Sequence, residues 1–150
     1  MKKNKLETQF NDAKFSLGFL VWKISNKLQS LHRLALKELD LTPTQFSVLA
    51  SVVYISSIQE NLTQSLLCKH TEMDKMLTSD IIKSLVAKKL VKKKENEEDS
   101  RSFLIQPTPL GIEKANKAIK IVEDIDQDFF KSVGNKGLFG VELNRILNDF

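Results

Sequence analysis

The sequence predicts a mainly α (α+β) protein, in which several helices accompany one short pair of strands. Two observations favour helix over most of the 150 residues: apolar residues recur at steps of three and four, and only 5 Gly and 3 Pro interrupt them. A third observation predicts the strands, because two β-prone segments, 90–94 and 101–105, enclose a polar stretch as the arms of a hairpin do. The length fits a single domain, residues 1–150.

A long amphipathic helix is expected over residues 7–39. Phe15, Phe19 and Trp22 widen its apolar face beyond one stripe, so we expect this helix to pack against another subunit. A second helix is expected from Pro43 to about residue 55, because threonine at position 42 suits the N-cap and proline suits the first helical position.

The centre of the chain predicts a helix-turn-helix. Thr63 can cap a short helix, 64–70, and Asp74 can cap a longer one, 75–89, which leaves four connecting residues. Apolar side chains at helical spacing are expected to face inward from the longer helix: Leu77, Ile81, Leu85 and Val86.

The predicted hairpin follows directly and would form a wing behind the second of these helices. Residues 42–106 are therefore expected to be a winged helix-turn-helix core that binds DNA. Thr108 and Pro109 open a further helix over about residues 110–133, and a last helix is expected over about 139–148.

Charge and composition limit the possible partners. Residues 1–39 and residues 69–94 each carry eight Lys or Arg against three Asp or Glu within a net charge of +4. Two basic blocks favour a polyanionic partner, although solvated helix faces have the same composition.

The longest apolar run, residues 17–22, is far shorter than the roughly 20 residues of a membrane span. The start of the chain lacks the apolar core of a signal peptide and Cys68 has no disulfide partner, so we expect a cytoplasmic protein without a membrane partner.

Four local strings, in the right order, resemble the MarR (multiple antibiotic resistance regulator) family over nearly the whole chain. They are Leu-Thr-Pro-Thr-Gln-Phe-Ser-Val-Leu at 41–49, Leu-Thr-Gln-Ser-x-Leu at 62–67, Asp-Lys-x-x-x-Thr at 74–78, and Asp-Ser-Arg at 99–101 followed by Thr-x-x-Gly at 108–111. Two residues depart from the family pattern. Pro107 replaces an aliphatic residue and could shorten the second wing strand, and Ser100 replaces a frequent arginine and removes one possible DNA contact.

The resemblance implies a transcriptional regulator, expected to be a repressor, that binds a pseudo-palindromic operator in double-stranded DNA as a homodimer. Residues 7–39 and 110–150 would be the dimerisation helices. A small aromatic effector would release the DNA by binding in a pocket lined by Phe15, Phe19, Trp22 and Phe46. Apolar residues at helical spacing also serve as plain core, which is the alternative for these four.

The helix that enters the major groove is expected to present its N-terminal residues to the bases. These candidates are Lys75, Met76, Thr78, Ser79 and Lys83, and the absence of Arg and Asn among them predicts modest direct readout with a larger share from DNA shape. On the wing, Arg101 is expected to enter the minor groove with Asp99 as its supporting partner, while Lys92, Lys93 and Lys94 contact phosphates. The acidic side chains of Glu95, Glu97 and Glu98 must then turn away from DNA at the tip.

The remaining polar residues suggest no second chemistry. His32 and His70 are too isolated for a metal site, Cys68 is expected to pack in the core, and neither a catalytic constellation nor a cofactor motif is present in the sequence. We therefore expect no enzyme and no cofactor. The alternative is a dimeric protein-interaction module, or antirepressor, that uses the same fold without binding DNA, which the acidic wing tip and the arginine-free helix would suit.

Overall fold

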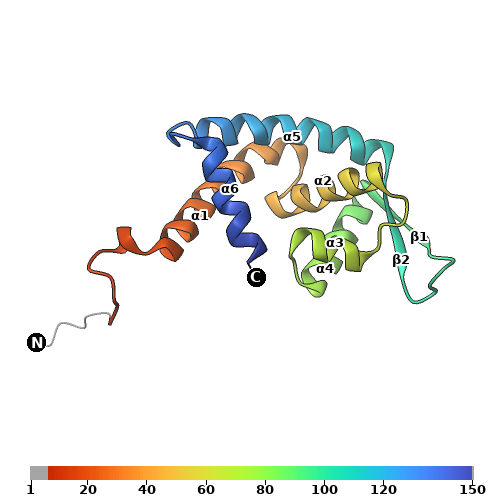
Figure 1. Ribbon diagram of the computed structural model, residues 1–150. Helices are drawn as coiled ribbons and strands as arrows, with labels where there is room; N and C mark the ends of the chain where they lie inside the picture. Colours follow the sequence, from red (N-terminus) through yellow and green to blue (C-terminus); the bar gives the residue numbers. More distant parts are fainter. Residues whose placement is uncertain (1–6, 150) are drawn as a thin grey trace, which may run out of the picture.

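The computed structural model describes residues 7–149, which form six α-helices and one two-stranded antiparallel sheet (Figure 1). The mainly α (α+β) prediction is confirmed. Helix α5 (Pro109–Phe129) packs along α1 (Leu17–Leu36) and α2 (Pro43–Ile58). Helices α3 (Gln64–Thr71) and α4 (Lys75–Ala87) lie below α2, and the hairpin of β1 (Val91–Glu95) and β2 (Phe103–Pro107) projects from that side.

Side-chain caps explain where the helices begin. Thr42 Oγ1 accepts from the Gln45 backbone N–H at 3.1 Å while Gln45 Oε1 accepts from the Thr42 backbone N–H at 3.1 Å, a complete capping box. Thr63, Asp74 and Thr108 accept from the backbone in the same way at the first turns of α3, α4 and α5. All four starts agree with the sequence prediction.

The predicted helix over residues 7–39 is divided into three pieces. Asp12 caps a separate 3₁₀ turn, η1 (Ala13–Phe15), and Ser16 then caps α1, so the long helix begins ten residues later than expected. A second 3₁₀ turn, η2 (Lys37–Leu39), follows α1 and ends at Asp40, whose left-handed backbone (φ 50°) turns the chain into α2.

The buried face of α4, the helix expected to enter the major groove, differs from the predicted one. Ile81 and Leu85 are buried as expected, but Leu77 is 45% exposed and Val86 is also exposed, while Thr78 and Ile82 are buried instead. The helix also ends two residues earlier, because Lys89 adopts φ 58° and the Leu90 N–H returns to the Leu85 carbonyl at 2.9 Å.

A hydrogen bond and an ion pair hold α4 against the start of α2. Gln45 Nε2 donates to Ser84 Oγ at 2.8 Å, and Lys88 Nζ pairs with the Asp40 carboxylate at 3.0 Å. The C-terminal half of the recognition helix is thereby tied to the start of α2, which leaves its N-terminal half as the outward end.

Pro107 does not shorten the wing. It is the last residue of β2 and lies opposite Val91 in the register. Ile105, two residues earlier, donates its N–H to the Leu62 carbonyl and not to β1, so the nitrogen at position 107 also faces away from β1. The strand loses no bond to its partner through the proline.

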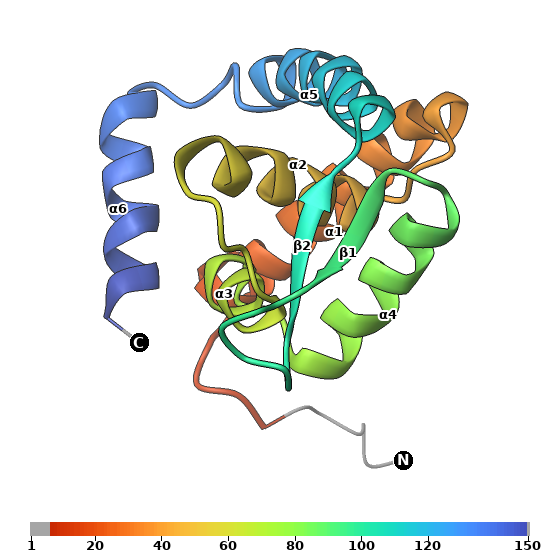
Figure 2. The ribbon, with the colours of Figure 1, turned by 90° about the vertical axis from the view of Figure 1, so that its right-hand side faces the viewer.

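Helix α6 (Lys136–Asn148) stands apart from the rest of the fold (Figure 2). It has no buried residue, and its large apolar side chains are exposed: Leu138, Phe139, Val141, Leu143, Ile146 and Leu147. The outer face of α1 is similarly apolar and exposed.

Within residues 7–149 no single helix combines the length and apolar character of a membrane span. The segments 17–39 and 43–58 meet these criteria only when they are taken together, and the pair is bent by 73°.

Candidate nucleic-acid interface

The exposed side of α4 carries most of the predicted base-contacting residues. Lys75, Met76 and Lys83 are exposed, with 77% of Met76 accessible to solvent, and Ser79 is half-buried. Lys83 Nζ pairs with Asp80 Oδ1 at 3.0 Å, but both side chains are about two-thirds exposed, so the pair gives little stability and leaves the lysine available.

The prediction that Thr78 contacts DNA bases is wrong. Its side chain is fully buried, and its hydroxyl donates to the Asp74 carbonyl at 2.8 Å. The bond satisfies the hydroxyl inside the helix, which allows a threonine to occupy a core position. Thr78 therefore helps to anchor the recognition helix and cannot reach a base edge.

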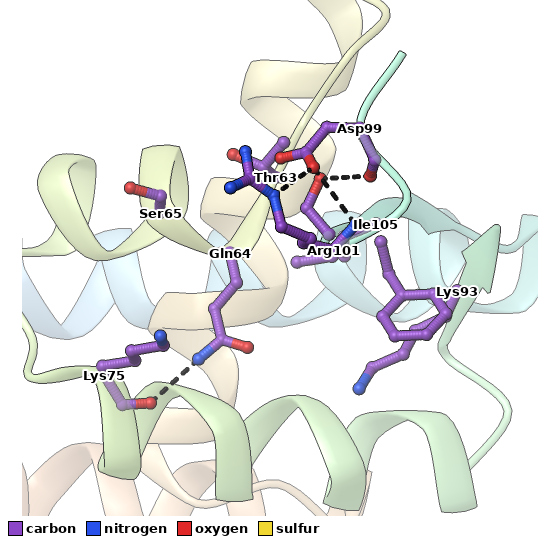
Figure 3. A pocket seen from close by; sticks show the side chains of 10 residues that line it. Thr63, Gln64, Ser65, Lys75, Lys93, Asp99, Arg101 and Ile105 are labelled. Carbon is purple, nitrogen blue, oxygen red and sulfur yellow. Dashed lines mark hydrogen bonds and ion pairs between the residues drawn. The ribbon is translucent and has the colours of Figure 1, made fainter. Parts of the chain in front are cut away.

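The wing presents Arg101 on a locally braced loop. Asp99 Oδ1 accepts from the Arg101 backbone N–H at 3.1 Å and from Arg101 Nε at 3.0 Å (Figure 3). The arginine side chain is 90% exposed, so its other nitrogens point into solvent. The predicted pairing of Asp99 with Arg101 is present, and it orients the guanidinium without covering it.

Asn96 and Ser102 brace the wing in a way that the sequence prediction missed. Asn96 Nδ2 donates to Ser102 Oγ at 2.8 Å across the loop, and Asn96 Oδ1 accepts from the Glu98 N–H at 3.1 Å. The Ser102 N–H returns to the Asp99 carbonyl at 3.0 Å. Glu97 and Glu98 remain exposed on this loop.

A cleft of about 270 Å³ joins the wing to the helix-turn-helix (Figure 3). Lys75, Lys93 and Arg101 line it together with the start of α3, where Gln64 Nε2 donates to the Lys75 carbonyl at 2.9 Å. The cleft brings the wing arginine and the first residue of the recognition helix to one positively charged surface. Lys93, which was predicted only as one of three phosphate-contacting lysines, is the one that belongs to this surface.

Lys92 and Lys94 lie on the other face of the wing. They are opposite Gln106 and Leu104 in the register, whereas Lys93 is opposite Ile105, and successive residues of a strand point to opposite faces. The role of Lys92 and Lys94 in binding DNA phosphates stays a prediction.

The Asp99 carboxyl provides a direct measure of the wing contact. The hydrogen bond from the Arg101 side chain holds the pKa of Asp99 below its ordinary 3.8, with a further contribution from the Arg101 backbone N–H. Because the pKa is lowered, the contact with Arg101 stabilises the folded protein at pH values above 3.8. This stabilisation is lost as the pH falls through the lowered pKa of Asp99. In Arg101→Ala we expect the Asp99 pKa to rise toward 3.8, measured by carboxyl ¹³C NMR titration; an unchanged pKa would show that the contact does not form in solution.

The predicted effector pocket is not assembled as expected. Phe46 is only 7% exposed and packs in the core. Phe15, Phe19 and Trp22 are instead exposed at the start of the chain, where Phe19 stacks on Trp22 with ring centroids 5.7 Å apart. Phe46 therefore belongs to the core, and its role in an effector pocket stays a prediction.

Cys68 and the two histidines lie in separate places. Cys68 is half-buried on α3. His32 Nε2 and Asp126 Oδ1 form a hydrogen-bonded pair at 2.8 Å between α1 and α5, and the His70 ring lies 5.9 Å from that of Tyr54.

Comparisons with known proteins agree on one family. A MarR family profile matches residues 39–102. The "Uncharacterized HTH-type transcriptional regulator YdcH" of Bacillus subtilis (strain 168) is 34% identical over 140 residues, which cover 93% of this chain and 95% of the relative.

Solved structures show the same fold. A cysteine-to-serine mutant of MarR from E. coli, complexed with operator DNA, superposes with a TM-score of 0.80 at 25% identity over 94% of this chain and 99% of that one. CouR from Rhodococcus jostii RHA1, bound to p-coumaroyl-CoA, superposes with a TM-score of 0.78 at 19% identity over 92% and 93%. The chain therefore belongs to the MarR family and is a DNA-binding transcriptional regulator with a winged helix-turn-helix, not an enzyme.

Proposed function

We propose that this regulator is a cytoplasmic repressor that binds a specific duplex operator, with α4 in the major groove and the wing in the minor groove. The observation that carries the proposal is the shared cleft, which places Lys75 of α4 and the braced Arg101 of the wing on one surface. A narrow minor groove concentrates negative potential and favours an inserted arginine. Lys75, Lys83 and Lys93 add cations for phosphates or base edges on the same side.

Direct base recognition would be modest. Ser79 can bond to several bases, and the exposed Met76 can contact a thymine methyl group. Since α4 presents no Arg or Asn, the deformability of the DNA and the spacing of two half-sites would supply much of the specificity.

A second copy of the chain is the proposed partner of the exposed apolar helices. Helix α6 has no buried residue, and the outer face of α1 exposes Leu17, Val21, Trp22 and Leu34. A monomer with apolar side chains along two whole helices is unfavourable in water. Pairing α1, α5 and α6 between two copies, within residues 7–39 and 110–150, would cover these faces and set the half-site spacing.

Ile146→Asp tests this dimer. A carboxylate placed in an apolar interface loses its hydration, so we expect the dimer dissociation constant to rise at least about tenfold, a change of ~1.4 kcal/mol, and operator affinity to fall with it. Sedimentation equilibrium measures the change. Asn144→Asp, which adds the same charge to the same helix, is the control; equal dimerisation of wild type and Ile146→Asp would contradict the interface.

A small aromatic effector is proposed to release the DNA. CouR, which shares the fold, was solved with p-coumaroyl-CoA, so this fold can hold an aromatic ligand. Phe15, Phe19 and Trp22 supply exposed aromatic surface on which such a ring could stack.

Genomic footprinting in cells tests the proposed function. We expect a small set of protected, pseudo-palindromic sites near promoters and increased transcription of the adjacent genes when the regulator is deleted. Absence of protected sites for the wild-type protein would contradict it and favour the protein-interaction module.

A further inference from the structure

A polar hollow of about 450 Å³ lies on the face of the wing that is turned away from Arg101. It is lined by Lys92, Lys94 and Gln106 from the two strands and by Ser56, Glu60 and Asn61 from the end of α2 and the connection that follows. The cleft with Arg101 and Lys93 shares none of these residues, so the wing has two separate charged surfaces.

Strand geometry brings the two lysines together. Lys92 and Lys94 are two residues apart on β1 and therefore point to the same face, next to Gln106 and Leu104 of β2. Neither lysine takes part in an ion pair within residues 7–149, although Glu60 lies in the same hollow. Two ammonium groups against one carboxylate leave the hollow positively charged.

Groups that can donate hydrogen bonds surround the two lysines. Ser56 Oγ is buried and makes no hydrogen bond to the part of the chain that the structure describes. Buried hydroxyl groups normally make a hydrogen bond, so Ser56 Oγ is free to bond to a group that enters the hollow. The side-chain amides of Asn61 and Gln106 can donate from the same walls.

We propose that this hollow binds a phosphate-type anion, which Lys92 and Lys94 neutralise and the Asn61 and Gln106 amides orient. Lysines act as point charges toward phosphate, and neutral amides add direction through hydrogen bonds. The anion comes either from a small phosphorylated ligand or from a phosphate of the DNA backbone.

Titration of the full-length protein with inorganic phosphate, at constant ionic strength and without DNA, tests the site. We expect saturable ¹H–¹⁵N shifts at Asn61, Lys92, Lys94 and Gln106. The double variant Lys92→Met/Lys94→Met should weaken phosphate binding at least about tenfold, while Lys117→Met/Lys120→Met, which removes the same charge from α5, should bind as wild type does. Absence of saturable shifts, or equal binding by wild type and the Lys92/Lys94 variant, would overturn the proposal.

Operator binding by the same variants separates the two sources of the anion. If the anion is a DNA phosphate, the slope of log affinity against log salt should be less negative by about two in the Lys92/Lys94 variant than in wild type. If it is a small ligand, operator affinity and slope should stay unchanged while phosphate binding is lost. Because the phosphate titration contains no DNA, its failure would leave the proposed operator binding untouched.

Discussion

Arg101→Ala is expected to weaken operator binding by about 1–3 kcal/mol, roughly 5- to 150-fold. The Arg101 side chain is 90% exposed, and its Nε is held at 3.0 Å from Asp99 Oδ1, so it is available and oriented before DNA arrives. A side chain that is ordered in advance loses less conformational entropy on binding. Gel-shift titration at a fixed salt concentration measures the loss.

Two further variants make the result specific. Asp99→Ala removes the brace but keeps the charge of the arginine, so it should cost less than Arg101→Ala. Arg33→Ala removes an exposed arginine from α1 and should leave affinity unchanged. If Arg101→Ala bound the operator as tightly as wild type while remaining folded, the proposed minor-groove contact would be wrong.

Gly111→Ala is expected to lower the free energy of unfolding by about 2 kcal/mol or more, because a Cβ at this position would lie 1.9 Å from the Leu90 carbonyl oxygen and 2.9 Å from its carbon. Backbone atoms cannot rotate away, so the cost belongs at the upper end of the ~1–3 kcal/mol typical of overpacking, against a gain in helix propensity of up to ~1 kcal/mol. Urea denaturation measures the difference.

Gly140→Ala is the matched control, because nothing lies within 4 Å of its Cβ position in α6. It should leave stability unchanged or raise it by up to ~1 kcal/mol. Equal stability of Gly111→Ala and wild type would mean that the close approach of α5 to the chain just before β1 is not present in solution.

Helix starts could be predicted from the sequence because a cap is a local interaction. Thr63 and Asp74 each bond to a backbone N–H three residues later, which any isolated segment could show. The end of α4 was not predicted, because the left-handed backbone that ends it is adopted by Lys89 and not by the glycine that usually marks such a position.

The proposed DNA-binding surface was likewise predictable only where its contacts are local in the sequence. Asp99 and Arg101 are two residues apart, so their pairing is local. The separation of Lys93 from Lys92 and Lys94 follows from the alternation of side chains along β1, but which of the two faces lies beside α3 and α4 depends on how the hairpin packs in the fold. Thr78 was misplaced because its burial is set by neighbours distant in the chain.

The salt dependence of duplex binding tests the central claim most directly. A regulator that places Lys75, Lys83, Lys93 and Arg101 against DNA should release counterions, so log affinity should fall linearly with log salt at about −0.9 per phosphate contacted. We expect a steep negative slope that becomes shallower in Arg101→Ala. Absence of duplex binding at low salt, or a slope near zero, would contradict the account.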